Sequence, residues 1–289
     1  MRLDRFISTL VHPFCRAAAG QIPILMYHSV SDDPETGVSP YYRIATRPEI
    51  FRQHMELLKA ADYRAVDLKT AVRELKHGSD QKMAVVTFDD GYRDFYSAAF
   101  PVLKRLDFTA SMFLPTAFIG SERRSFKNRE CLTWGEVKEM HAAGIHFGSH
   151  TVNHPKLVEL DWPQIKSELA DSKTEIEQRL GAAADTFAYP FAFPETNRAF
   201  VQRLKETLNA TGYECCVTTR VGRAQAGDDL MQLKRLPANS CDDAKLFRAK
   251  LDGAYDWLAP VQAGVKRLKS FVAPRRSSSP ETKTKAAHV

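Results

Sequence analysis

The sequence predicts an α/β protein with a parallel sheet and crossover helices, arranged either as a barrel or as a doubly wound sheet. Strand-like and helix-like segments alternate over roughly 250 residues, which is typical of repeated βα units. The chain has 289 residues, 44% hydrophobic and 26% charged, so it can bury a sizeable core as an ordinary globular protein. No apolar run approaches the roughly 18 residues that a membrane-spanning helix needs.

Apolar runs predict the strands, and apolar residues at helical spacing predict the helices. The expected strands are 22–30, 83–88, 109–114 and 145–150, followed by the short segments DTFAYP, YECCVTT and QLKRLP. The expected helices are 47–61, entered through Pro48, a segment ending near Leu106, 133–144 and 161–181. Thr133 and Asp161 can cap the last two helices, and Gly144 and Gly181 can end them.

The excess positive charge is confined to one end of the chain. The formal net charge is +6, and residues 266–289 carry seven basic residues against the single acid Glu281, which accounts for all of it. The rest of the chain is close to neutral, so we expect no nucleic-acid partner. The segment 266–289 is rich in Ser, Pro and Lys, which predicts a disordered tail. Such a tail could make a weak contact with a membrane surface or an anionic polymer.

Residues 1–20 superficially resemble a signal peptide, but His12, Pro13 and Arg16 interrupt the apolar centre. We therefore expect an uncleaved leader or an amphipathic surface helix there, then one domain over 21–265 and the tail over 266–289. The five cysteines form no C-x-x-C pair and are odd in number, which favours a reducing compartment. This predicts a cytoplasmic location, with association to a membrane as the alternative.

Functional side-chain types follow four of the expected strands, where the loops of a (β/α) barrel build the active site. They are His28, the pair Asp89 and Asp90, the pair His150 and His154, and the YPFAFP segment. Two neighbouring carboxylates raise each other's pKa unless a cation compensates one of them. A solvated turn is the alternative interpretation of the Asp-Asp-Gly sequence.

His150 and His154 form an H-x-x-x-H pair, and residues four apart on a helix or a tight turn can reach one ion. Two unrelated surface histidines are the alternative. Together with Asp90 they make a ligand set with open positions for water and substrate, as in catalytic metal sites. We expect a divalent metal, zinc first, although cobalt or nickel would also suit these ligands. With Asp90 bound to the ion, Asp89 can stay ionised and take a proton from a water that the ion has acidified.

The segments TFDDGY, HTVNH and FAYPFAFP resemble the first three motifs of the polysaccharide deacetylases, carbohydrate esterase family 4. The resemblance covers residues 20–258 and implies a distorted (β/α) barrel of about seven parallel strands. It also implies metal-dependent removal of acetyl groups from an acetylated polysaccharide or glycan. By this resemblance Asp89 is the catalytic base, and the metal ligands are Asp90, His150 and His154. The backbone N–H of Phe191 would stabilise the oxyanion.

The sequence departs from the family pattern in its third motif and in its general acid. Many members have an arginine that orients the base where this chain has Phe187, Ala188 and Tyr189, and Ala192 replaces the usual glycine. The late Leu-x-His motif, which supplies the acid, is absent. The segment ILMYHSV resembles the first strand of poly-N-acetylglucosamine deacetylases, which implies a circularly permuted barrel with His28 as the general acid. A buried histidine bonded to the backbone is the alternative role for His28.

We therefore predict a metal-dependent hydrolase that removes N-acetyl groups from a polysaccharide or glycan. An O-acetyl esterase is the alternative enzyme, because an alkoxide leaving group also accepts a proton. From a different class, the chain could be a carbohydrate-binding barrel that has lost turnover through its third-motif changes.

Overall fold

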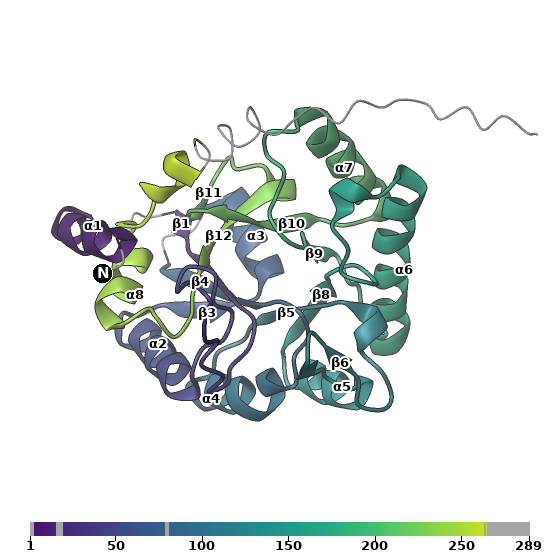
Figure 1. Ribbon diagram of the computed structural model, residues 1–289, viewed down its shortest axis with the longest axis horizontal. Coiled ribbons are helices and arrows are strands. Elements are labelled where there is room, and N and C mark those ends of the chain that lie inside the picture. Colours follow the sequence, from purple (N-terminus) through teal and green to yellow (C-terminus); the bar gives the residue numbers. More distant parts are fainter. Residues whose placement is uncertain (1–2, 16–19, 79–80, 263, 265–289) are drawn as a thin grey trace, which may run out of the picture.

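The computed structural model describes residues 3–15, 20–78, 81–262 and 264 (Figure 1). Parallel strands form a closed barrel, so the barrel expectation is confirmed and the doubly wound sheet is not the fold. The seven barrel strands, in their order around it, are β2 (Ile24–Tyr27), β12 (Leu233–Pro237), β10 (Cys215–Val221), β9 (Thr186–Ala188), β8 (His146–Ser149), β5 (Ser111–Leu114) and β4 (Met83–Phe88). The pairing of β4 with β2 closes the barrel, and β3 (Arg64–Val66) pairs with the first half of β4 outside this ring.

Strand β4 shows why these segments form a parallel barrel. All six of its residues are buried, as expected for a parallel strand that is covered on both faces. It pairs with β2 in a register that joins Tyr27 to Phe88. The two strands therefore end at the same level, and the residues that follow them, His28 and Asp89, emerge side by side.

Helices surround the barrel in Figure 1. They are α2 (Pro48–Ala60), α3 (Leu68–His77), α4 (Phe100–Leu106), α5 (Trp134–Ala142), α6 (Trp162–Leu180), α7 (Arg198–Thr211) and α8 (Ala244–Leu251), with α1 (Leu3–Val11) at the periphery. A π-helical turn, Phe95–Ala99, precedes α4, and short 3₁₀ turns cover His12–Phe14, Thr116–Phe118, Leu157–Glu159 and Leu230–Gln232. Thr133 and Asp161 cap α5 and α6 as predicted, each within a capping box.

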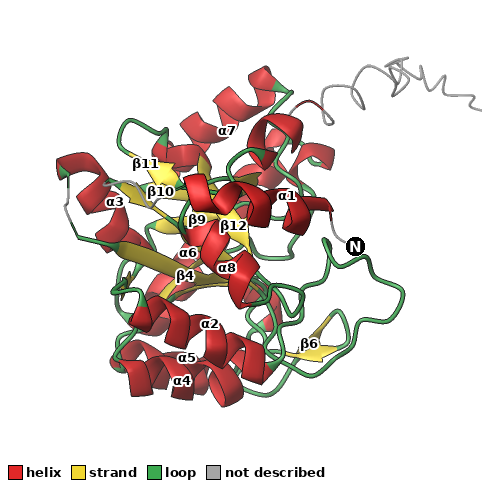
Figure 2. Cartoon of the chain, turned by 90° about the vertical axis from the view of Figure 1, so that its left-hand side faces the viewer, coloured by secondary structure: helices red, strands yellow, loops and turns green. Residues whose placement is uncertain are grey.

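Several elements differ from the prediction. The expected strand 22–30 divides at Pro23 into β1 (Gln21–Ile22) and β2, because proline has no N–H for the ladder. β1 pairs with β11 (Ala224–Gln225). Helix α5 ends at Ala142, two residues before Gly144. β3, α3 and the hairpin of β6 (Ser125–Phe126) and β7 (Arg129–Glu130) were not predicted. Figure 2 shows β6 at the edge of the molecule, away from the main helices.

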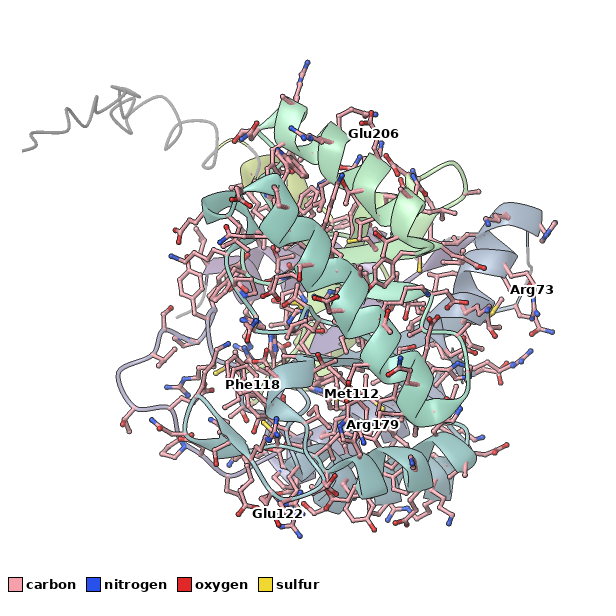
Figure 3. All side chains as sticks on the ribbon, turned by 90° about the vertical axis from the view of Figure 1, so that its right-hand side faces the viewer. Arg73, Met112, Phe118, Glu122, Arg179 and Glu206 are labelled. Carbon is pink, nitrogen blue, oxygen red and sulfur yellow. The ribbon has the colours of Figure 1, made fainter. Side chains whose placement is uncertain are left out.

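The core lies on both sides of the strands. In Figure 3, Met112 of β5 lies inside the molecule, whereas Arg73 and Glu206 lie at its outer edge, in agreement with their burial. Aromatic rings form part of the core: the ring of Phe88 at the end of β4 packs against those of Tyr27, Phe51 and Phe95. None of the helices described here has both the length and the apolar character that crossing a bilayer requires. The predicted disordered tail lies outside the described residues, so it stays a prediction.

Candidate metal centre and active site

The predicted site residues meet at the carboxyl end of the barrel. Asp89 and Asp90 follow β4, His150 follows β8 and His28 follows β2. His154 Nε2 lies 3.1 Å and His150 Nε2 lies 3.6 Å from Asp90 Oδ1. The H-x-x-x-H pair therefore lies on a tight turn after a strand and not on a helix.

The backbone is strained at several of these positions. Asp90, His154 and Phe191 all have positive φ angles, of 72°, 53° and 60°. Non-glycine residues rarely occupy this left-handed region, and such strain concentrates at functional sites. Gly91 also has a positive φ, and a Cβ atom there would lie 2.9 Å from Ile119 Cδ1. The conformation at this position therefore favours the glycine of the TFDDGY motif, and a larger residue would also displace the Ile119 side chain.

Asp90, His150 and His154 form a buried group whose candidate ligand atoms all lie within 4.8 Å of one another. His150 Nδ1 lies 2.7 Å from the carbonyl oxygen of Ala188, and a proton donated in this bond leaves Nε2 free to act as a ligand. Within the described residues, only the two imidazoles approach the buried Asp90 Oδ1, without a hydrogen bond of good geometry, and the buried His154 Nδ1 has no hydrogen-bond partner. A buried carboxylate oxygen without a donor is costly, so these residues fit a divalent cation well.

The other oxygen of Asp90, Oδ2, already accepts hydrogen bonds from two side chains. The hydroxyl of Tyr92 donates to Asp90 Oδ2 at 2.9 Å, and Lys127 Nζ lies 3.4 Å from the same oxygen. Burial alone would raise the pKa of Asp90, but His154, His28, His150 and Lys127 together hold it far below its ordinary value. Asp90 is therefore a carboxylate, as a metal ligand must be.

Lys127 is a site residue that the sequence did not reveal. It lies in the turn between β6 and β7, where both Lys127 and Asn128 have positive φ angles. Its ammonium lies 4.5 Å from the ring centre of Phe126 and 5.4 Å from that of Phe191. The hairpin thus brings a positive charge over the edge of the site.

Arg235 is the second residue that the sequence did not reveal. From the middle of β12, its guanidinium donates to both carboxylate oxygens of Asp89, at 2.7 and 2.8 Å, and to the carbonyl of Thr218 at 3.0 Å. Burial alone would raise the pKa of Asp89, but Arg235, with His150 and His28, lowers it below its ordinary value. An arginine thus contacts the first acid of the TFDDGY motif, although it comes from β12 and not from the third motif. The segment QLKRLP was predicted as a strand, but only the fold shows that its arginine faces Asp89.

His28 Nε2 lies 3.8 Å from Asp89 Oδ2. Its side chain is mostly buried but lines a pocket of about 590 Å³, together with Tyr41, Tyr42 and Ala192. Burial lowers the pKa of His28, and Arg235 and Lys127 add to this, while Asp89 and Asp90 oppose it. His28 therefore lies beside Asp89 and also borders the pocket.

The YPF segment lies beside His154. The ring of Phe191 is partly exposed and packs edge-on against His154, with ring centres 4.6 Å apart. Thr219 on β10 fixes this loop, because its hydroxyl donates to the carbonyl of Phe191 and accepts from the N–H of Phe193. The loop is thus held beside the candidate metal ligands.

Comparison with known proteins identifies relatives of this chain. The family model for polysaccharide deacetylase matches residues 76–215, which include both acids and both histidines. A relative from Bacillus subtilis, YxkH, also carries the name polysaccharide deacetylase. It is 31% identical to this chain over 237 residues, and the match covers 80% of this chain and 76% of that protein. The poly-β-1,6-N-acetyl-D-glucosamine N-deacetylase of Staphylococcus aureus is 28% identical over 151 residues, and the match covers 49% of this chain and 51% of that enzyme.

Among solved structures, the Streptococcus pyogenes deacetylase PplD in complex with acetate superposes with a TM-score of 0.68. It is 27% identical, and the match covers 81% of this chain and 99% of that one. The similarity extends well beyond the motifs, over most of the barrel. With a shared barrel and a relative above 30% identity over most of both chains, this chain belongs to the polysaccharide deacetylase family.

Proposed function

We propose that this polysaccharide deacetylase is a metal-dependent hydrolase that removes N-acetyl groups from a polysaccharide or glycan. One observation carries the proposal. An ionised carboxylate, Asp89, is held by Arg235 directly beside the buried set Asp90, His150 and His154. A general base next to a candidate cation site, with His28 at the border of a pocket, is an arrangement that suits amide hydrolysis.

A divalent ion bound by Asp90, His150 and His154 would acidify water and polarise the acetyl carbonyl. We infer zinc as the first candidate, with cobalt and nickel as alternatives, because two imidazoles and one carboxylate suit all three. His150 would bind through Nε2, since its Nδ1 bonds to the carbonyl of Ala188.

Asp89 acts as the general base in this proposal. Arg235 occupies one lone pair on each carboxylate oxygen, so each oxygen keeps another that can accept a proton. As the oxygen of the attacking water bonds to the acetyl carbon, its proton passes to Asp89. The fixed orientation of the carboxylate favours this transfer, because the base needs no reorganisation when substrate binds.

His28 acts as the general acid. It donates its proton to the sugar nitrogen while the carbon–nitrogen bond breaks, which leaves acetate and a free amine. The backbone N–H of Phe191 donates to the carbonyl oxygen as negative charge develops on it. The positions of His28 beside Asp89 and of Phe191 beside His154 support these two roles.

The pocket beside His28 supports a sugar substrate. Tyr41 and Tyr42 line it, and aromatic side chains offer flat apolar surface to the ring faces of a glycan. The N-deacetylase activity named for the S. aureus relative makes an N-acetylglucosamine polymer the first substrate to test.

Acetate release from purified protein tests the proposal. The protein is stripped with a chelator, dialysed, reloaded with zinc, cobalt or nickel, and mixed with poly-β-1,6-N-acetylglucosamine, chitin oligosaccharides or an O-acetylated polymer. We expect acetate from an N-acetylated substrate only after metal is restored, and none from an Asp89→Asn variant. Release from O-acetylated polymers alone would identify an esterase. Binding of glycans without any acetate release would identify a carbohydrate-binding barrel.

A further inference from the structure

Helix α1 exposes its apolar side chains to solvent and buries polar ones, the reverse of an ordinary surface helix. Such helices turn their apolar stripe toward the core and their polar face to solvent. Here Leu3, Phe6 and Leu10 are 68%, 48% and 63% exposed, and Phe14 in the following turn is 88% exposed. We call these four residues the α1 apolar face. They recur every three or four positions, so they lie on one side of the helix.

The polar residues of α1 hold it on the protein. Ser8 is fully buried and accepts a hydrogen bond from Trp257 Nε1 at 3.0 Å. The hydroxyl of Tyr255 donates to Asp4 at 2.8 Å, and Arg5 forms an ion pair with Asp243. The apolar face is therefore turned outward by specific contacts behind it. Figures 1 and 2 agree that α1 lies at the outside of the molecule, beside α8.

The α1 apolar face continues toward the active site. A groove of about 360 Å³ is lined by Leu3 together with Tyr41, Leu258 and Val261. The last three of these residues also line the pocket that contains His28. The exposed apolar surface thus runs from the helix to the mouth of the substrate pocket.

The charge of the adjoining sequence favours an anionic partner for this surface. Between Asp256 and Glu281 the chain carries no acidic residue and five basic ones, Lys266, Arg267, Lys269, Arg275 and Arg276. This basic sequence begins five residues after Val261, which lines the groove. An exposed apolar helix face in a chain that also carries a run of basic residues is a combination that favours binding to anionic lipid at a bilayer surface.

We propose that the α1 apolar face docks on an anionic lipid bilayer and holds the mouth of the active-site pocket next to the membrane surface. The apolar side chains enter the headgroup region, and the basic residues add electrostatic attraction. This surface is separate from the residues that carry out the proposed reaction, so it can be tested independently of activity.

Vesicle co-sedimentation of the full chain tests the proposal. The probes are vesicles of pure phosphatidylcholine and vesicles with equal parts of phosphatidylcholine and phosphatidylglycerol. Wild-type protein should bind the anionic vesicles, more weakly in high salt, and bind the neutral ones less. The Phe6→Ser/Leu10→Ser variant should bind anionic vesicles about tenfold more weakly or worse. Because both side chains are exposed, its thermal unfolding should match wild type.

Val158→Ser is the matched control. Val158 is 45% exposed in the turn before α6, which Figure 1 shows on the opposite side of the barrel from α1. This variant should bind vesicles like wild type. No binding by wild type, or equal binding by the α1 variant, would overturn the proposal. Sedimentation velocity without lipid gives a third check, because a dimer that the α1 variant dissociates would show that a second copy covers this face instead.

Discussion

Arg235 and Asp89 form a buried two-point ion pair that joins the middle of β12 to the carboxyl end of β4. Both guanidinium-to-carboxylate distances are short, 2.7 and 2.8 Å, and both side chains are almost fully buried. Arginine's planar fork fixes the plane of a carboxylate in a way that a lysine ammonium cannot. The base of the proposed reaction is thus positioned by a residue 146 positions later in the chain.

Replacing Arg235 by lysine should therefore impair catalysis without emptying the metal site. Arg235→Lys keeps a positive charge but loses the second hydrogen bond, so Asp89 can rotate. We expect kcat/KM for acetate release to fall by about 10- to 100-fold, as for other residues that orient a catalytic group. Elemental analysis should find the same metal content as in wild type. Arg220→Lys, at a more exposed pair with Glu195, is the control and should retain activity. Full activity in Arg235→Lys would show that the ion pair only stabilises the barrel.

The metal assignment predicts a loss of bound metal when either histidine is removed. His150→Ala and His154→Ala should each lower the metal content of purified protein, because each removes one of three protein ligands. The comparison variant is His146→Ala, at the start of β8, the strand that His150 follows, where the side chain is half-exposed. Unchanged stoichiometry in both ligand variants, measured on protein with a wild-type circular dichroism spectrum, would refute the assignment.

The sequence reveals those parts of the site that depend on local spacing, and it misses those that depend on distant pairing. Asp90, His150 and His154 were predictable because parallel strands end at one edge of the barrel, so residues just after them converge. Arg235 lies 146 positions from Asp89 along the chain. The sequence around an arginine within a strand does not show which distant residue it contacts. Similarly, nothing local shows that Lys127 reaches Asp90, because its hairpin has strands of only two residues.

His28 provides a test of the general acid. His28→Ala should lower kcat on an N-acetylated substrate by about 10² to 10⁴, the usual contribution of a positioned acid. Bound metal should be unchanged, because His28 lies outside the candidate ligand set. An acetyl ester with a good leaving group needs little protonation and should lose much less activity. His141→Ala, in α5, is the control. If His28→Ala cleaves both substrates at wild-type rates, His28 has a structural role only.

A different histidine, His54 in α2, should make the fold sensitive to acid. It is buried against the ring of Phe247, its Nε2–H donates to the carbonyl of Asp242 at 2.7 Å, and its Nδ1 accepts from the Tyr27 hydroxyl at 2.9 Å. Both contacts suit the neutral ring. Burial lowers the pKa of His54 from 6.5 to about 4, against the opposing charge of Asp242.

The unfolded chain therefore takes up this proton at a higher pH than the folded protein does. Stability from His54 is fully present above about pH 6.5 and is lost as the pH falls toward 4, by about 2 kcal/mol between pH 7 and pH 5. Denaturant unfolding of His54→Gln should lack this part of the pH dependence, although the variant is less stable at pH 7. His77→Gln, at the exposed end of α3, should follow wild type. An equal loss of stability between pH 7 and pH 5 in wild type and His54→Gln would contradict the prediction, because it would mean that His54 takes up its proton equally in both states.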